Sequence, residues 1–232
     1  MVLSVHQPQY IPWLGYFHKI AKSDVFVFLD NVQYKEREFQ NRNKIRTPEG
    51  WIWLTVPVIS KGKGRQNIHE VAIDNEIQWQ EKHLRSLKTY YAHAEFFKEH
   101  VGFFQDLYSR KWDKLVDLNI AIIGYVLKYL EINTTVYFET KLNIASIHTE
   151  RIIDICKTLD ADTYFSGIGG RDYLEEGRFL EEKLKLVYQD FKHPGYRQQF
   201  MKDKEGFIPY MSILDLIFNE GPRSRAILLG GG

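Results

Sequence analysis

The opening stretch of the chain, residues 1–46, constrains the fold more than any other part of the sequence. An apolar run, Val2–Val5, predicts a buried strand, and Leu14–Lys22 shows the residue spacing of a helix. A second apolar run, Val25–Leu29, predicts the next strand. Because two strands that are joined through a helix run parallel, this stretch predicts a β-α-β unit of a parallel sheet.

The alternation of strands and helices returns in the second half of the chain. Short runs rich in β-branched and aromatic residues predict further strands, and stretches with helical spacing lie between them. Right-handed crossovers would add these strands to the same sheet. The predicted strands are Thr134–Glu139, Thr163–Ser166 and Leu184–Gln189, and the predicted helices are Thr149–Leu159, Tyr173–Lys183 and Ser212–Asn219.

The middle of the chain combines two strand-like stretches with a long helical region. Trp51–Val58 and Ile68–Ile73 predict strands that form a hairpin attached to the main sheet. Apolar residues at three- and four-residue spacing then predict helices over Glu76–Tyr91, Ala94–Lys111 and Asp113–Glu131.

The predicted fold class is therefore α/β, with a mainly parallel, Rossmann-like sheet flanked by helices. No low-complexity linker and no internal repeat divides the sequence. We expect a single α/β domain over residues 1–232, with a helical insertion at about 76–131.

Composition narrows the range of partners and compartments. A net charge of +1 argues against a stable nucleic-acid partner, because such proteins need a basic face. No apolar window reaches the length of a membrane span. The single cysteine, Cys156, fits a reducing cytoplasm, and its place in an apolar-periodic stretch predicts a buried side chain. We predict a soluble, cytoplasmic protein.

Polar residues follow the first predicted strand, where ligands of parallel sheets bind. His6 comes directly after that strand and can exchange hydrogen bonds and protons with a ligand near neutral pH, so it is the first candidate for a general base. The alternative is a histidine that only holds its own loop together. The neighbouring candidates for substrate binding are Gln7, Gln9 and Tyr10.

The start of the first predicted helix resembles a known catalytic motif without its catalytic groups. In nucleotidyltransferases and pantothenate synthetases, an H-x-G-H motif opens a helix after a strand-end segment. Trp13, Gly15 and Tyr16 stand at the matching positions here, so both histidines are absent. The glycine would still let a backbone or a ligand approach closely. The topology thus favours a nucleotidyltransferase-like sheet but not adenylyl transfer by that histidine pair.

A cluster of amides and arginines follows the second predicted strand. Arginine forms paired hydrogen bonds with phosphate, and amides recognise hydroxyl groups, so the cluster suits a sugar or phosphate ligand. The alternative is a plain solvated loop. The candidate residues for substrate binding are Asp30, Gln33, Tyr34, Arg37, Gln40, Asn41 and Arg42.

A glycine-rich turn follows the predicted strand Thr163–Ser166 and resembles a cradle for phosphate or carboxylate. Its candidate residues are Ser166, Gly167, Gly169, Gly170 and Tyr173.

Two further candidates for catalysis lie near the C-terminus. His193 is a second candidate base, and Asp215 could orient a histidine. Capping and surface solvation are the alternatives for Asp215. No spacing of histidine, cysteine or acidic residues matches a metal site, and the sequence identifies no cofactor.

Several segments, in order along nearly the whole chain, resemble the WbqC-like protein family. That resemblance implies a role in the biosynthesis of O-antigen and other surface polysaccharides, with transfer of an amino acid onto an amino sugar as a suggested activity. The segments that carry the resemblance are HQPQYIPWLGYFHKI, FVFLDNVQYKEREFQNRNKI, WLTVPV, TYFSGIGGRDYL, YQDFKHPGYRQQF and SILDLIFNEGP.

The resulting hypothesis is a transferase that acylates, or aminoacylates, a nucleotide-linked amino sugar. Its partners would be the nucleotide sugar and an acyl donor such as an aminoacyl-tRNA end or an acyl adenylate. One alternative is a non-catalytic module that binds nucleotide sugars. Another is a nucleotidyltransferase-like enzyme with altered catalytic groups.

Overall fold

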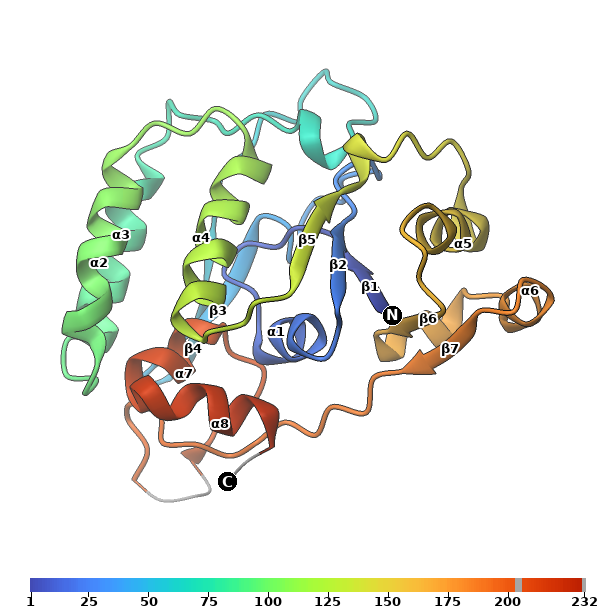
Figure 1. Cartoon of the computed structure of the whole chain (residues 1–232). Coiled ribbons are helices and arrows are strands. Elements are labelled where there is room, and N and C mark those ends of the chain that lie inside the picture. The colour runs from blue at the N-terminus through green and yellow to red at the C-terminus, as the bar shows by residue number, and fades with distance from the viewer. Residues whose placement is uncertain (203–205, 231–232) are drawn as a thin grey trace.

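A parallel sheet of five strands forms the centre of the structure (Figure 1). The computed structural model describes residues 1–202 and 206–230. The strands lie in the order β5-β2-β1-β6-β7, and every neighbouring pair is parallel. The predicted α/β class with a mainly parallel sheet is confirmed. The strands are β1 (Val2–His6), β2 (Val25–Phe28), β5 (Thr135–Phe138), β6 (Thr163–Ser166) and β7 (Lys185–Tyr188).

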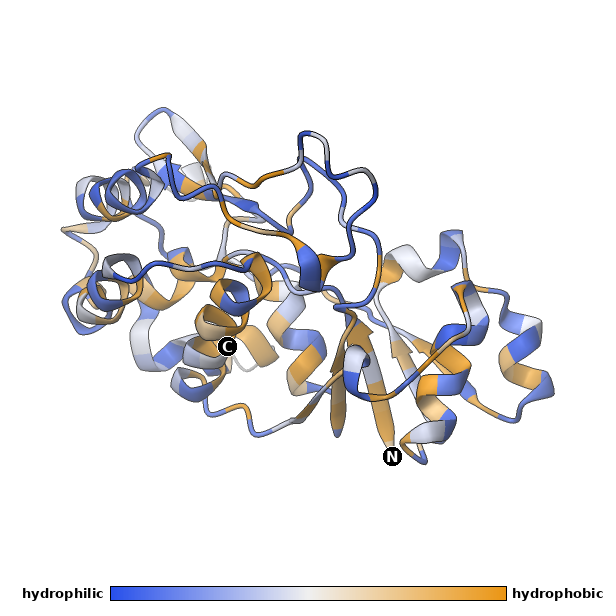
Figure 2. Cartoon of the chain, turned by 90° about the horizontal axis from the view of Figure 1, so that it is seen from above, coloured by the Kyte–Doolittle hydropathy of each residue, from blue (hydrophilic) through white to orange (hydrophobic). Residues whose placement is uncertain are grey.

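Helices cover both faces of this sheet because alternate strand residues point to opposite sides. Leu3 and Val5 of β1 pack with apolar residues of α5 and α6, while Phe26 and Phe28 of β2 join a larger cluster with α1 and α4. Figure 2 shows the hydrophobic strands between helices whose outer faces are hydrophilic. The helices are α1 (Leu14–Ala21), α2 (Trp79–Tyr91), α3 (Phe97–Ser109), α4 (Leu115–Tyr129), α5 (His148–Thr158), α6 (Glu176–Glu181), α7 (Ile213–Glu220) and α8 (Ser224–Leu229).

The chain changes its direction of progress across the sheet at β1. It adds β2 and then β5 on one side, and it returns to add β6 and β7 on the other. β1 pairs with β2 as far as His6, opposite Phe28. Its pairing with β6 stops at Leu3, opposite Tyr164. The carboxyl ends of β1 and β6 are therefore not paired with each other, and this separation positions the site described below.

The hairpin of the structure differs from the predicted one in its strands and in its place outside the main sheet. β3 (Arg42–Thr47) pairs antiparallel with β4 (Gly50–Thr55), apart from the main sheet. The strand predicted over Ile68–Ile73 is wrong, because Ile68–Glu70 forms a 3₁₀ helix. The two predicted segments pair through an isolated antiparallel bridge, Val58 with Ile73, and not as a hairpin of two strands. The Asn67 backbone N–H, just before that helix, donates to Glu70 Oε2 at 2.7 Å, which favours the turn over an extended strand. β3 was missed because its sequence is mostly polar.

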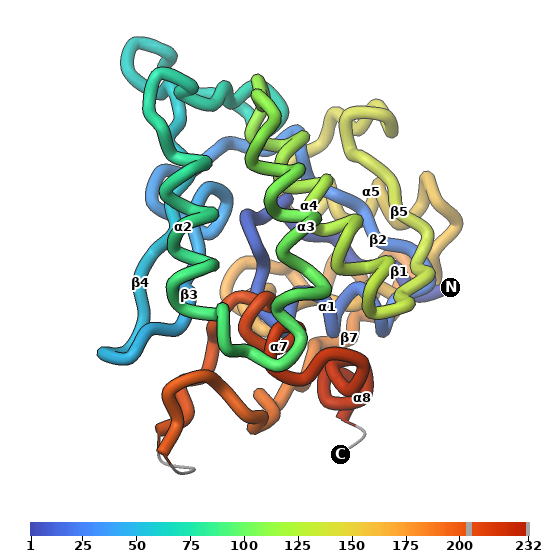
Figure 3. Tube along the Cα trace, turned by 90° about the vertical axis from the view of Figure 1, so that its left-hand side faces the viewer, coloured from blue at the N-terminus to red at the C-terminus, as the bar shows by residue number. Residues whose placement is uncertain are grey.

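The helical region between β4 and β5 forms as predicted, with ends shifted by a few residues. Figure 3 shows α2 and α3 side by side, with the β3–β4 hairpin beside α2. In the second half, the prediction of a helix from Tyr173 starts too early. The glycine turn Ile168–Asp172 is itself a 3₁₀ helix, and α6 begins only at Glu176. Helix α8 was not predicted.

Gly15 shows why α1 needs a glycine in its first turn. A Cβ atom added at Gly15 would lie 2.2 Å from the indole ring of Trp13. The indole in turn packs edge-on against Phe191, with 5.5 Å between ring centroids. A side chain of the same segment therefore occupies the space that the glycine leaves, which gives Gly15 a packing role.

We expect Gly15→Ala to lower the free energy of unfolding by about 1–3 kcal/mol, because the added methyl group collides with the Trp13 indole. Gly102 of α3 is a matched control, since it is exposed and has nothing within 4 Å of an added Cβ. There Gly102→Ala should raise stability by about 0.5–1 kcal/mol, as alanine favours helix. Urea unfolding of the two variants measures both values. Equal effects at the two positions would contradict the packing role of Gly15.

Candidate functional site

The loop after β1 and the amide-rich segment after β2 meet at the carboxyl end of β1. Gln40 Nε2 donates to Gln7 Oε1 at 2.8 Å, and the Tyr16 hydroxyl donates to the Gln7 carbonyl at 3.1 Å. The His6 ring packs edge-on against the Tyr16 ring, with 4.9 Å between centroids. Segments that are far apart in the sequence thus present amides, a phenol and an imidazole at one strand end.

His6 is held as a neutral imidazole. Its Nδ1 lies 3.1 Å from the Gln7 carbonyl oxygen, which can only accept, so Nδ1 carries the proton and Nε2 keeps its lone pair. Burial, followed by the positive charge of Lys19, lowers the pKa of His6 to about 3. The ring therefore stays uncharged at neutral pH. Nε2 can accept a hydrogen bond from a ligand, although its basicity is reduced.

Lys19 of α1 is the residue of this site that the sequence analysis missed. The side chain is buried, with 3% of the residue exposed, and Nζ donates to the Val5 carbonyl of β1 at 2.9 Å. Burial lowers the pKa of Lys19 to about 7. The available signal was its spacing, because it lies three residues after the buried Tyr16 and beside the buried Ile20 on a short helix.

The glycine-rich turn after β6 reaches the same place. A Cβ added at Gly167 would lie 3.7 Å from Lys19 Nζ, with no other atom within 4 Å. At Gly170 an added Cβ would lie 2.1 Å from Ser166 Oγ, so this glycine allows the turn to pack on itself. Gly169 has nothing within 4 Å of that position, and Tyr173 is 63% exposed. Gly167 is thus the member of the predicted cradle that faces a cation.

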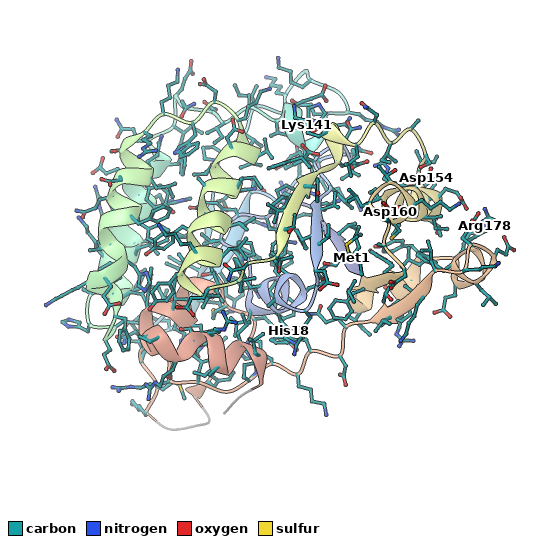
Figure 4. The ribbon with its side chains drawn as sticks, viewed as in Figure 1. Met1, His18, Lys141, Asp154, Asp160 and Arg178 are labelled. Atoms are coloured by element: carbon teal, nitrogen blue, oxygen red, sulfur yellow. The ribbon has the colours of Figure 1, made fainter. Side chains whose placement is uncertain are left out.

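Gln189, which follows β7, ties these segments together. Its backbone N–H donates to the Ser166 carbonyl at 2.7 Å, and its side-chain amide donates to the Gly15 carbonyl and to His18 Nδ1, both at 2.9 Å. Figure 4 shows His18 on α1, beside the chain that leaves β7. The ends of β6 and β7 and helix α1 are therefore held in a fixed relation.

Some residues predicted to bind substrate are used inside the fold. The buried Tyr10 hydroxyl lies 2.8 Å from His83 Nδ1 and 2.6 Å from the Tyr108 hydroxyl. The Asp30 carboxylate accepts from the backbone N–H of Thr140 at 3.0 Å and from its hydroxyl at 2.7 Å. The Tyr10 contacts join the loop after β1 to α2 and α3, and the Asp30 contacts join the end of β2 to the segment after β5. Both side chains are buried among these partners.

The remaining residues of the amide and arginine cluster divide into buried and exposed members. Arg42 lies over the Trp53 ring, 4.3 Å from its centroid, and donates to the Arg37 carbonyl. Asn41 Nδ2 donates to the Val56 carbonyl at 2.9 Å. Gln33 and Arg37 are exposed, whereas Gln9, Tyr34, Gln40 and Asn41 are buried.

His193 and Asp215 occupy structural positions. His193 Nδ1 lies 2.9 Å from the Pro194 carbonyl, and Nε2 accepts from the Tyr210 backbone N–H at 3.1 Å. No lone pair of this ring is free to take a proton. The Asp215 carboxylate is fully buried and accepts from the Tyr91 and Tyr196 hydroxyls at 2.8 and 2.9 Å. Burial raises its pKa to about 6. Neither geometry supports the predicted catalytic role.

Among the residues that the structure describes, no group of three or more histidine, cysteine or acidic side chains could hold a metal ion. No helix within residues 1–202 and 206–230 is long and apolar enough to cross a membrane. A cavity of about 870 Å³ lies between the segment around Ile73 and the end of α3 near Arg110. It is lined by none of the candidate residues.

Burial of Lys19 makes stability depend on pH in a predictable direction. The unfolded lysine has a pKa near 10.5 and the folded one about 7, so the unfolded chain binds more protons between these values. Stability therefore rises with pH through this window. At about 1.4 kcal/mol per pKa unit, the difference amounts to a few kcal/mol.

Lys19→Met should remove this rise, so its stability relative to the wild type is highest below pH 7 and declines toward pH 10.5. Lys22→Met is a matched control, because Lys22 is exposed on the same turn of chain. Denaturant unfolding between pH 6 and pH 10 measures these dependences. Parallel curves for Lys19→Met and the wild type would show that Lys19 is not desolvated.

Comparison with known proteins identifies the family. The model of the WbqC-like protein family matches residues 7–227. The uncharacterized protein Rv1507c of Mycobacterium tuberculosis is 36% identical over 220 residues, which cover 94% of each chain. No solved structure matches the chain. The chain therefore belongs to the WbqC-like protein family.

Proposed function

We propose that the protein is a transferase of surface-polysaccharide biosynthesis that acylates the amino group of a nucleotide-linked sugar. The observation that carries the proposal is the meeting of neutral hydrogen-bonding groups, Gln7 and His6, with the buried cation of Lys19 at the carboxyl end of β1. Such a site suits a ligand that combines hydroxyls, an amine and phosphate. The chain belongs to the WbqC-like family, and the pathway proposed here is the one that the resemblance to this family implies.

The topology supports a ligand at this position. Counted along the chain within the main sheet, the strand order is 3-2-1-4-5. Doubly wound, Rossmann-like sheets share this order and bind ligands outside the carboxyl ends of the strands, where the order reverses. We propose that residues 1–232 form one such domain, related in topology to nucleotidyltransferases. We also place the protein in the cytoplasm, where a free, buried Cys156 stays reduced.

The proposed reaction assigns a role to each group at the end of β1. Gln7 and Gln40 bind sugar hydroxyls, and the exposed Arg37 binds phosphate. The amine attacks the acyl carbonyl, a C–N bond forms, and the bond to the leaving group of the acyl donor breaks. His6 Nε2 accepts the hydrogen bond of the attacking amine and takes its proton as the C–N bond forms.

A non-catalytic nucleotide-sugar-binding module is the second candidate. The observation that favours it is the low pKa of His6, about 3, which weakens this ring as a base. The absence of both histidines of the H-x-G-H motif, replaced by Trp13 and Tyr16, points the same way. In this case the site would bind the sugar nucleotide and present it to another enzyme.

Binding and product analysis separate the candidates. We expect UDP-glucosamine to raise the melting temperature and, with an acyl adenylate or aminoacyl-tRNA, to yield an N-acylated product detected by mass spectrometry. Binding without product supports the module. Stabilisation by ATP with magnesium and not by sugar nucleotides would favour a nucleotidyltransferase-like activity instead.

His6→Ala should abolish the transfer, by at least about 100-fold, while UDP-glucosamine still binds, because the acceptor at Nε2 is lost. His93, an exposed histidine, provides the matched control, and His93→Ala should keep full activity. Circular dichroism establishes that both variants fold. Full transfer by His6→Ala would remove this histidine from the mechanism.

A further inference from the structure

Lys19 is a buried lysine without a counter-ion. One of its three N–H groups donates to the Val5 carbonyl at 2.9 Å, and 3% of the residue is exposed. None of the ion pairs among the described residues includes it. Burial is the only cause of its lowered pKa, so no carboxylate offsets the loss of hydration.

An unpaired charge in this position costs stability. An apolar residue at position 19 would fit a helix whose residues Tyr16, Phe17 and Ile20 are all buried. When protonated, the lysine therefore weakens the fold on its own, and an anion beside it would offset this cost. This is the pattern of a residue that serves a ligand and not the core.

The place of Nζ points to the same conclusion. The pairing of β1 with β6 ends at Leu3. Beyond that point, Lys19 Nζ donates a hydrogen bond to the Val5 carbonyl. On the side of β6, Gly167 has no side chain, and, its chain neighbours Ser166 and Ile168 aside, Nζ is the one atom within 4 Å of where its Cβ would stand. The Lys19 amine thus lies where the two strands separate, beside backbone that carries no side chain. In doubly wound sheets this is where the phosphate groups of nucleotides bind.

We propose that Lys19 is a second phosphate-binding residue, in addition to the Arg37 of the proposed reaction, and that it holds the diphosphate of the substrate between the end of β1 and Gly167. The nucleotide-sugar identity of that substrate rests on the function proposed above, whereas the affinity for a diphosphate does not. Two N–H groups of Nζ remain to donate to phosphate oxygens, and Gly167 lets those oxygens approach the backbone.

Proton uptake follows from this geometry. Lys19 is mostly neutral above pH 7, and a diphosphate beside it favours the ammonium form, so binding takes up a proton. The other titratable groups of the site do not compete. His6 has a pKa of about 3, burial raises the pKa of Tyr16, and both stay neutral at pH 8. On the glycine turn, Arg171 and Asp172 are exposed to solvent.

Titration calorimetry with the full chain tests the proposal. Inorganic pyrophosphate and UDP-glucosamine are titrated at pH 8 in two buffers that differ in ionisation enthalpy, which gives the number of protons exchanged. Pyrophosphate itself carries a titratable proton at pH 8, so the proton count is compared between variants. The wild type and the control Lys22→Met should take up close to one proton more per pyrophosphate than Lys19→Met, and Lys19→Met should lose at least 10-fold in affinity. The wild-type affinity for pyrophosphate needs no variant, and its absence overturns the proposal even if Lys19→Met does not fold.

The outcomes separate this proposal from the proposed function. Pyrophosphate binding that depends on Lys19, without affinity for UDP-glucosamine, keeps the phosphate site and overturns the nucleotide-sugar function. Binding of UDP-glucosamine with equal affinity and equal proton exchange in wild type and Lys19→Met keeps the function and overturns the role of Lys19. Absence of binding for both probes overturns both proposals.

Discussion

The burial of β1 between two parallel neighbours is the constraint on which the rest of the structure depends. Both faces of this strand are covered, so its apolar residues Leu3 and Val5 face α5 and α6, while Ser4 lies against α1, where its hydroxyl accepts from Ser23. Its pairing is complete toward β2 and partial toward β6. The first residues of β1 are therefore paired on both sides, whereas its last residues have no strand partner on the side of β6.

The site is built where that free backbone begins, and its electrostatics follow from desolvation. His6 and Lys19 both have lowered pKa values because water is excluded from them and no carboxylate lies beside them. A pair of neutral amides, Gln7 and Gln40, lies beside His6. The region is therefore polar, and its one charge at this point is that of Lys19, which is only partly protonated near pH 7 and would become fully protonated beside an anion. A nucleotide diphosphate matches this behaviour, since it brings the charge that the region lacks.

Buried hydrogen bonds and aromatic contacts attach the C-terminal segment to the rest of the fold. Asp215 accepts hydrogen bonds from Tyr91, Tyr196 and Gln198, which come from α2 and from the segment before α7. Trp13 packs against Phe191 and Tyr210 of the same segment. These contacts attach the C-terminal segment to the start of α1. The polar residues that the sequence suggested as catalytic groups here are the ones that hold this attachment.

Local patterns determined much of the fold by themselves. The apolar runs of β1 and β2, the strands and helices that alternate after residue 134, and the helices from 76 to 131 follow from periodicity, which reports burial along a single element. The strand ends also predicted where the candidate site lies, because parallel strands present their carboxyl ends at one edge. The hairpin partner of β4 could not be read this way. β3 is polar, and its buried Asn43 is satisfied by the Ile11 carbonyl, a contact that depends on distant chain.

Tertiary structure alone decided which polar residues are bonded to partners inside the fold and which stay available at the strand ends. Tyr10, Asp30 and Asp215 have the same chemistry as binding residues, and only their partners show that they are structural. Lys19 reads in the sequence as one more lysine on a helix, yet it is buried at the separation of β1 and β6. The physical reason is that desolvation and hydrogen-bond satisfaction are properties of surroundings assembled from several segments, whereas a sequence pattern records only the preferences of its own stretch.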